Sequence, residues 1–235
     1  MHKKIIVLGY GLLGKEIVRQ TNWDYVSRSS SNIDFNKTDW YHYLETYNIV
    51  INCIANTNTY SKDRESHWQT NYVSVMNLVD WCNENNKKIV HISTDYIYSN
   101  SVSNASEDDV PVSNKTWYAY TKLLGDAYVQ ARAKDYLLIR TSFKPSPFPY
   151  PEAITTQIGN FDYVNKISEL IIKLINKNAC GVFNVGTQKK TIYDLAIKTN
   201  PNIIGSFRIL NKEMPRDVTM NISKMEKFLN EKKQH

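Results

Sequence analysis

Residues 4–14 read KIIVLGYGLLG, and this stretch decides the fold. The apolar run at residues 4–8 predicts a short buried strand, and glycines follow it at once at positions 9, 11 and 14. In the spacing GxGxxG, the first glycine permits a tight turn, the second lets the backbone approach a pyrophosphate, and the third lets helix and strand pack closely. A helix that begins after such a turn offers free N–H groups and a favourable dipole to an anion. The stretch therefore predicts dinucleotide binding, with a purely structural turn as the alternative.

Residues 1–140 alternate short apolar runs with longer amphipathic ones. We expect strands at residues 4–8, 25–27, 49–54, 89–92 and 136–139, and helices at residues 12–20, 40–47, 65–85 and 118–133. In the third helix, apolar residues from Val75 to Cys82 keep the i, i+3, i+4, i+7 spacing of a face that packs on a sheet. The alternation is typical of βαβ units and predicts a parallel sheet.

The composition changes at four prolines between Pro145 and Pro151, which predict an extended loop. Beyond it we expect helices at residues 162–176, 192–199 and 223–230 and strands at 182–185 and 206–210. The expected fold is α/β, a Rossmann-like doubly wound parallel sheet with helices on both faces and a small C-terminal substrate lobe. Residues 1–142 would form the dinucleotide-binding domain, to which 161–186 return, and residues 143–160 and 187–235 would form the lobe.

Composition narrows the classes of protein. The chain has 235 residues, 42% of them hydrophobic, and a net charge of +6. No apolar run approaches the roughly 18 residues that a membrane helix needs, and no secretory signal is recognised, so we expect a soluble, cytoplasmic protein without a membrane partner. The three cysteines are expected to be small buried residues, and the histidine spacing predicts no metal centre. The basic residues are scattered, which favours a polyanionic small ligand over nucleic acid.

The residues at the end of the second expected strand indicate which cofactor is bound. An acidic residue there would accept hydrogen bonds from a ribose 2′-hydroxyl, whereas an arginine would bind a 2′-phosphate. Arg28, followed by serines, favours NADP(H), while Asp34, twenty residues past Gly14, keeps NAD(H) as an alternative. The alternative for Arg28 is a solvated surface charge without a ligand.

A tyrosine and a lysine form a candidate catalytic pair. Tyr118 and Lys122 lie four residues apart at the start of an expected helix, and therefore on one face. The ammonium would stabilise the phenolate and lower the pKa of the tyrosine, which makes it a proton donor for a carbonyl. Thr94, at the end of the fourth expected strand, could hold the same oxygen, because the carboxyl ends of parallel strands face the ligand crevice.

These marks, taken in order, resemble the extended short-chain dehydrogenase/reductases and, more narrowly, the dTDP-4-dehydrorhamnose reductase family. The likeness covers nearly the whole chain. Its motifs include HISTDYIY at residues 91–98, NCIA at 52–55, Asn71, YAYTK at 118–122, RTS at 140–142 and MPR at 214–216.

The resemblance implies roles for particular residues. Thr94, Tyr118 and Lys122 would form the catalytic triad, and Lys122 would also hold the nicotinamide ribose. The other residues implied for the cofactor are Gly9, Gly11, Leu12, Leu13, Gly14, Arg28, Asp34, Phe35, Cys53, Ile54, Ala55 and Asn71. Those implied for the sugar are Asp95, Tyr96, Phe143 and Arg216.

The function implied is an NADP(H)-dependent reductase of the 4-keto group of a nucleotide-activated deoxysugar, with a homodimer through the helices at residues 65–85 and 118–133. Three departures matter: the glycine loop is one residue shorter than in the family, Phe143 stands where the family has tryptophan, and residues 143–157 lack a segment of the substrate pocket. Two alternatives stay open. One is an epimerase or dehydratase of the same superfamily with Asp95 as acid or base, and the other is a non-catalytic NADP-binding regulatory subunit.

Overall fold

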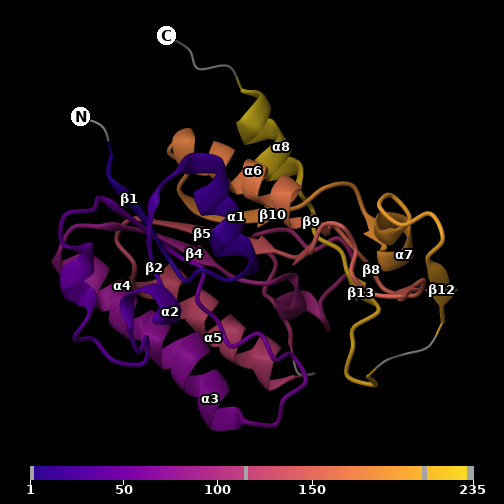
Figure 1. Ribbon diagram of the computed structural model, residues 1–235, viewed down its shortest axis with the longest axis horizontal. Helices are drawn as coiled ribbons and strands as arrows, with labels where there is room; N and C mark the ends of the chain where they lie inside the picture. The colour runs from indigo at the N-terminus through magenta and orange to yellow at the C-terminus, as the bar shows by residue number, and fades with distance from the viewer. Residues whose placement is uncertain (1–2, 114–115, 208–210, 232–235) are drawn as a thin grey trace. The chain divides into compact units, whose positions relative to one another are not determined.

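The computed structural model describes residues 3–113, 116–207 and 211–231 (Figure 1). The chain forms two compact units. The first comprises Met1–Ser93, Thr116–Ile139 and Cys180–Val182, and the second comprises Thr94–Lys115, Arg140–Ala179 and Phe183–His235. The domain limits expected from the sequence differ from these units: of residues 161–186 only 180–182 return to the first unit, and residues 140–142 and the longer segment 94–115 belong to the second. Contacts distant in sequence hold this segment there: the Asn104 N–H donates to Thr219 Oγ1 at 2.8 Å, and the Asn184 N–H donates to the Glu107 carboxylate, also at 2.8 Å.

A parallel sheet forms the centre of the first unit. Its strand order is β10-β5-β4-β3-β1-β2, and the pairs from β5 to β2 are all parallel, as the alternation of strands and helices predicts. β5 and β10 continue into the second unit. Every residue of β1 and β3 is buried, the pattern of a parallel strand covered on both faces. The strands are β1 (Ile5–Leu8), β2 (Asp24–Val26), β3 (Ile49–Asn52), β4 (Lys88–Ile92), β5 (Tyr136–Thr141) and β10 (Gly181–Val185).

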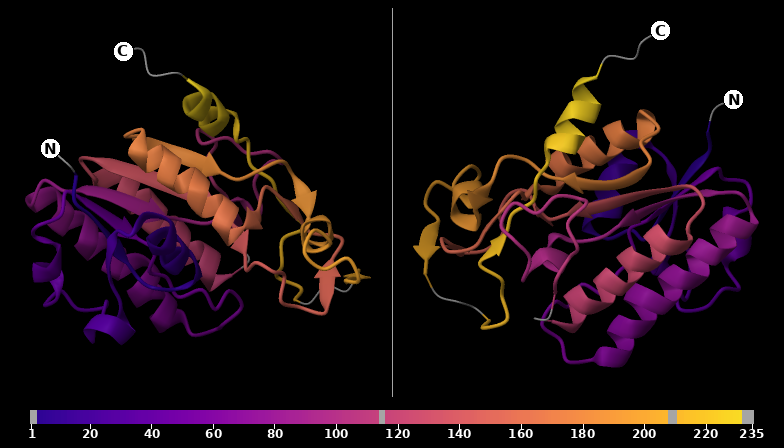
Figure 2. Two further views of the ribbon diagram at one scale, coloured as in Figure 1. Left: turned by 45° about the horizontal axis from the view of Figure 1, so that its top comes forward. Right: turned by 180° about the vertical axis from the view of Figure 1, so that it is seen from behind.

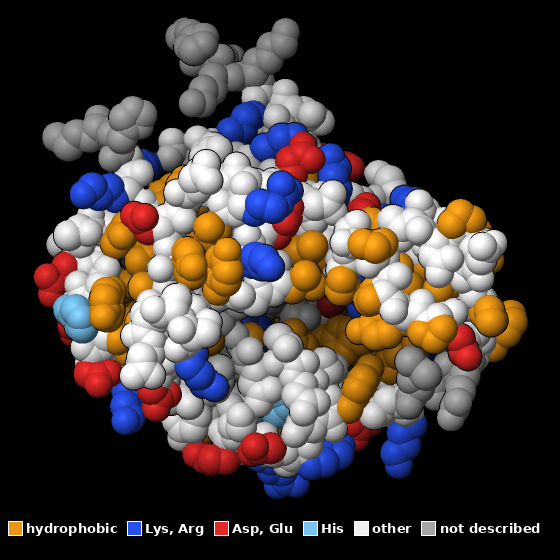
Figure 3. Space-filling model, in the orientation of Figure 1, with side chains coloured by type: hydrophobic (Ala, Val, Ile, Leu, Met, Phe, Trp, Pro, Cys, Tyr) orange, Lys and Arg blue, Asp and Glu red, His pale blue; other side chains and the backbone are white. Residues whose placement is uncertain are grey.

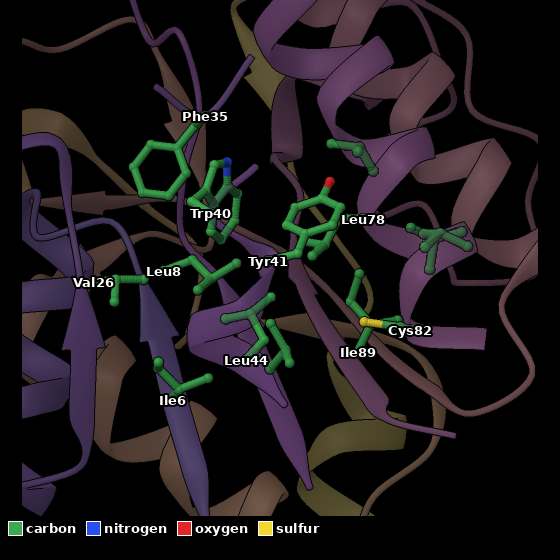
Figure 4. Packing of buried hydrophobic residues seen from close by; sticks show 14 of the residues in the cluster. Ile6, Leu8, Val26, Phe35, Trp40, Tyr41, Leu44, Leu78, Cys82 and Ile89 are labelled. Carbon is green, nitrogen blue, oxygen red and sulfur yellow. The ribbon is translucent and has the colours of Figure 1, made fainter. Parts of the chain in front are cut away.

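Helices cover both faces of this sheet (Figures 1 and 2). On one face, Gly14 of α1 (Leu12–Thr21) packs close to Val7. Because side chains alternate along a strand, Ile6 and Leu8 point to the other face, where they join the large apolar cluster shown in Figure 4. There α4 (Ser74–Glu84) and α5 (Trp117–Arg132) lie side by side, purple and rose in Figure 2.

Three elements of the first unit differ from those expected. The helix expected at residues 65–85 consists of α3 (Arg64–Trp68), a π-helical turn η2 (Gln69–Val73) and α4. The helix expected at 40–47 is only the 3₁₀ turn η1 (Tyr41–Leu44), because the chain turns directly into β3: the Asn48 N–H bonds the Lys4 carbonyl at 2.8 Å. A short helix α2 (Arg28–Ser31), which the sequence did not predict, follows β2.

The second unit is built from short elements around its own apolar core of aromatic and aliphatic side chains, among them Phe148, Phe161 and Leu195. Its strands form three small sheets, with orders β11-β8-β13, β12-β7 and β6-β9. The elements are η3 (Asp95–Tyr98), β6 (Phe143–Lys144), β7 (Glu152–Ile154), β8 (Ile158–Gly159), β9 (Asp162–Tyr163), α6 (Val164–Asn176), β11 (Lys190–Thr191), α7 (Ile192–Ala196), β12 (Ile204–Ser206), β13 (Asp217–Val218) and α8 (Ser223–Asn230).

The elements expected after residue 143 agree with the structure only in part. The final helix has the expected limits, and α7 ends three residues early at Ala196. Of the strand expected at residues 206–210, Ser206 is the last residue of β12, and residues 208–210 lie outside the described residues. Cys180 is exposed, so the expectation of three buried cysteines was wrong at that position.

Among the described residues, no helix is both long and apolar enough to cross a membrane.

Candidate functional site

The glycine loop after β1 has a different constraint at each glycine. Gly9 has a φ of +90°, which L side chains rarely adopt, and its N–H bonds the Val26 carbonyl at 2.9 Å. A Cβ on Gly14 would lie 2.0 Å from the Gly9 carbonyl oxygen, so the fold itself requires glycine there. A Cβ on Gly11 would meet nothing within 4 Å. Gly11 therefore leaves open space at the N-terminus of α1, where an anion is favoured.

A pocket of about 730 Å³ opens at this loop. It lies at the carboxyl ends of β1, β2 and β3, where open α/β sheets bind their ligands. The sequence-predicted cofactor residues that line it are Gly9, Gly11, Arg28, Phe35, Cys53, Ile54 and Ala55. Leu12, Leu13, Gly14, Asp34, Asn71 and Lys122 are not among its lining residues. The lining residues that the sequence did not predict are Tyr10, Ser27, Ser29, Asn56, Ser66 and Thr70.

A serine-rich turn presents Arg28 at this pocket. The buried Ser27 caps α2, because its hydroxyl accepts the Ser30 N–H at 3.1 Å and lies 2.8 Å from the Ser30 hydroxyl. Arg28 itself is exposed. Asp34 is also exposed, and its carboxylate accepts the Asn36 N–H at 3.1 Å in a local turn. A cation and several hydroxyls thus gather at the end of β2.

Tyr10 belongs to the glycine loop and stacks on Tyr25 of β2, with ring centroids 4.1 Å apart and planes 15° apart. Both rings are more than one third exposed, so each covers the other on the surface of the unit. No sequence pattern predicts the pair, since it depends on the register of two strands. Val7 pairs with Tyr25 and Leu8 with Val26, which brings the loop beside β2.

Asn71, on the π-helical turn, holds a loop that lines the pocket. Its side chain is fully buried and makes two bonds to the backbone of Asn56: Oδ1 accepts the N–H at 2.8 Å, and Nδ2 donates to the carbonyl at 3.1 Å. Nδ2 also lies within bonding distance of Thr121 Oγ1 and of His67 Nδ1. π-helical turns inside helices are frequent at functional sites. Asn71 therefore connects a pocket-lining loop to α5.

Tyr118 and Lys122 lie in the first two turns of α5, as the sequence predicted. The Tyr118 ring is half-buried, with its centroid 6.3 Å from that of His67. Lys122 is 1% exposed and its Nζ donates to the Ile92 carbonyl at 2.6 Å. Burial lowers the pKa of Lys122 to about 8, although the Asp126 carboxylate opposes this shift. Burial raises the pKa of the neighbouring Cys53 thiol to about 12, so this cysteine stays neutral.

Thr94, the third candidate of the triad, belongs to the second unit. Its hydroxyl caps η3 by accepting the Tyr96 N–H at 3.2 Å, and it donates to Asp95 Oδ1 at 3.3 Å. Asp95 is 1% exposed. Burial raises the pKa of Asp95 to about 7, against the charge of Lys144 and the hydrogen bonds from Thr94 and Ser142.

The remaining residues expected at the sugar also lie in the second unit. Gln157 brings two of their segments together: its Nε2 donates to Tyr96 Oη at 3.2 Å and to the Pro215 carbonyl at 3.0 Å. Arg216 follows with an exposed side chain, and its carbonyl accepts the Ile158 N–H. Phe143 is half-buried at the start of β6.

A glycine turn at the carboxyl edge of a parallel sheet with helices on both faces defines a protein of the Rossmann-like class. The chain belongs to the RmlD substrate binding domain family, whose model matches residues 3–144.

Solved structures share this fold. A dTDP-4-dehydrorhamnose reductase from Bacillus anthracis str. Ames, in complex with NADP, matches 96% of this chain and 92% of its own, with a TM-score of 0.82 and 19% identity. A UDP-glucuronic acid 4-epimerase from Bacillus cereus, in complex with NAD, matches 96% of this chain and 89% of its own, with a TM-score of 0.74 and 20% identity.

A curated relative is similar in sequence over a shorter stretch. The spore coat polysaccharide biosynthesis protein SpsK of Bacillus subtilis (strain 168) is 30% identical over 111 residues. The match covers 41% of this chain and 39% of the relative, so it spans about two fifths of that protein's length.

Proposed function

We propose that this protein is an NADP(H)-dependent reductase that acts on the 4-keto group of a nucleotide-activated deoxysugar in the cytoplasm. The observation that carries the proposal is the pocket in the first unit, where an open glycine turn and a cation with hydroxyls line one cavity of about 730 Å³. A relative of the same fold is a dTDP-4-dehydrorhamnose reductase in complex with NADP.

The lining residues fit a dinucleotide. Gly11 leaves room for a pyrophosphate at the free N–H groups of α1, and Arg28 with Ser29 would bind the 2′-phosphate. Phe35 and Ile54 supply apolar surface for the adenine, and NAD(H) stays the weaker alternative. When bound, NADPH supplies the hydride for carbonyl reduction.

The chain's own side chains would handle the proton. Lys122 would stabilise the phenolate form of Tyr118, which would give its proton to the substrate oxygen that Thr94 holds. Because the pKa of Lys122 is about 8, this assistance should fade as the pH rises above 8. Asp95, Tyr96, Phe143 and Arg216 form the proposed sugar-binding set.

The test is NADPH oxidation with dTDP-4-dehydrorhamnose and related nucleotide-linked 4-keto-6-deoxysugars, with wild type compared with Tyr118→Phe. We expect turnover of at least one of these sugars, and a fall in kcat of roughly a hundredfold or more in the variant with unchanged NADPH affinity. A wild-type protein that binds NADPH but reduces none of the sugars would contradict the reductase and favour a binding subunit.

An epimerase is the second candidate, because Asp95 is a buried carboxyl whose pKa of about 7 suits an acid–base group. A UDP-glucuronic acid 4-epimerase shares the fold. The two functions differ in cofactor balance: a reductase consumes one NADPH per sugar, whereas an epimerase interconverts sugars without net consumption.

A further inference from the structure

Four side chains of the second unit, the candidate Thr94 among them, form a polar cluster in which Thr94 and Asp95 are buried and Ser142 and Lys144 half-buried. Asp95 is its centre, with Thr94 and Ser142 as hydrogen-bond donors and Lys144 as the cation. Lys144 lies on β6, which pairs with β9, and its Nζ is 5.9 Å from the centroid of the buried Phe161 ring. Among the charged groups described in this unit, Lys144 is the one whose charge acts on Asp95. Arg140 donates instead to the Tyr98 hydroxyl and the Glu107 carbonyl.

The hydrogen bonds of Thr94 restrict what it can do for a ligand. A hydroxyl has one proton to donate, and in this structure Thr94 directs it to the Asp95 carboxyl. One of its lone pairs accepts the Tyr96 N–H. While Asp95 is ionised it accepts only, so it competes with a substrate oxygen for the Thr94 proton. A protonated Asp95 donates instead, and the Thr94 proton becomes available to a carbonyl.

Lys144 also affects the protonation equilibrium of Asp95. Its ammonium favours the ionised carboxylate, and Asp95 in turn favours the charged form of Lys144, whose pKa burial lowers. Burial alone would keep Asp95 neutral well above the usual range of a carboxyl. At this carboxyl burial is the larger effect and the charge of Lys144 opposes it, next to a hydroxyl proposed to hold the reacting oxygen.

We propose that Asp95 and Lys144 are positioning residues that set whether the Thr94 hydroxyl donates to Asp95 or to the substrate carbonyl. The role in catalysis rests on the proposed reductase function, but the coupling among the three side chains does not. Neither the motifs nor the glycine loop suggests this positioning role for Lys144.

Titration of the protein without ligands tests the coupling directly. The Asp95 carboxyl is followed by ¹³C NMR in protein labelled at aspartate, with Asp95→Asn to identify the signal. We expect a midpoint near 7 in wild type. Lys144→Met and Thr94→Val should each move it upward, by about one pH unit for the lysine, because each removes support for the ionised form. Lys144→Arg and Thr94→Ser should keep it near the wild-type value.

Lys177→Met is the matched control, since Lys177 belongs to the same unit but bonds the carbonyls at the end of α8. It should leave the Asp95 midpoint unchanged. A wild-type midpoint below 5, or a midpoint that neither Lys144→Met nor Thr94→Val moves, would overturn the coupling.

The pH profile of kcat then tests the role in catalysis, with dTDP-4-dehydrorhamnose as the probe. We expect an ionisation near pH 7 in wild type that moves upward in Lys144→Met and disappears in Asp95→Asn, while the KM for NADPH stays the same. An unchanged profile in both variants would overturn the positioning role. If the protein binds NADPH and the NMR shifts occur but no sugar is reduced, the proposed function fails while the coupling stands, and the claim for catalysis falls with the function.

Discussion

Gly11 and Gly14 separate what the fold needs from what a ligand needs. Gly14→Ala places a Cβ 2.0 Å from a backbone oxygen, so we expect a loss of about 3 kcal/mol or more in the free energy of unfolding. Gly11→Ala has free space and should change stability by less than about 0.5 kcal/mol. It should nevertheless weaken NADPH binding tenfold or more, because the methyl group occupies the space proposed for the pyrophosphate. Urea unfolding and fluorescence titration measure both; wild-type NADPH affinity in Gly11→Ala would refute the loop assignment.

Lys122 makes the free energy of unfolding depend on pH. Its pKa is about 8 in the folded protein and 10.5 for a solvated lysine, so between these limits the unfolded chain binds the proton more strongly. Stability therefore falls as the pH drops from 10.5 to 8 and is level below. Relative to Lys122→Met, wild type should gain up to about 3 kcal/mol between pH 7 and pH 10.5. Urea unfolding of both proteins at the two pH values checks this, and a constant difference would contradict it.

Among single residues, the sequence identified those whose type indicates their chemistry: Gly9, Gly11, Arg28 and the segment 53–55 all line the pocket. It missed Tyr10, Ser66 and Thr70, which are ordinary residue types placed there by packing. It also placed Asn71 at the cofactor, whereas the structure shows it bonded to the pocket-lining Asn56. That difference follows from the π-helical turn, which no local pattern indicated.

The stack of Tyr10 on Tyr25 joins the glycine loop to β2, and it should hold the shortened loop in shape for a phosphate. An aromatic pair of this kind contributes about 1 kcal/mol beyond its buried area. Tyr25→Ala should therefore weaken NADPH binding by roughly fivefold, while Tyr25→Phe retains it. Tyr43→Ala is the control, because Tyr43 is an exposed tyrosine of the same unit outside the pocket lining. Equal affinities in Tyr25→Ala and wild type would contradict this role.

The π-helical turn between α3 and α4 makes a second element-scale prediction. Asn71→Ala leaves the N–H and carbonyl of Asn56 without side-chain partners, which should cost about 2 kcal/mol of stability and loosen the pocket loop. Asn83→Ala is matched to it, since Asn83 also makes two bonds to the backbone, at Arg132, the last residue of α5, and at Lys134 beyond it. Both variants should lose stability, but only Asn71→Ala should lose NADPH affinity. A similar loss in both would mean that Asn71 is merely structural.

Elements were predictable where burial is periodic. The four strands from β1 to β4 and the helices α1 and α5 lie within three residues of their expected limits. The helix expected at residues 40–47 did not form at full length. Aromatic side chains supply much of its apolar character, and Trp40 packs edge to face against both Phe35 and Tyr41 (Figure 4). Such packing fixes a 3₁₀ turn as readily as a helix.

For the whole molecule, the order of strands and helices predicted the Rossmann-like class, because few topologies satisfy βαβ alternation. The second unit could not be predicted in the same way. Its strands are two or three residues long, too short for any periodicity, and contacts distant in sequence hold residues 94–115 in it. On the face shown in Figure 3, basic and acidic side chains are interspersed, in keeping with the scattered charge of the sequence.

The central claim is that the pocket of the first unit binds NADP(H). A crystal structure of the protein soaked with NADP⁺ tests it most directly. We expect the pyrophosphate at the N–H groups of Gly11 to Leu13, the 2′-phosphate within hydrogen-bond distance of Arg28, and the adenine beside Phe35. A pyrophosphate bound away from the glycine loop, or a 2′-phosphate without contact to Arg28, would contradict the account.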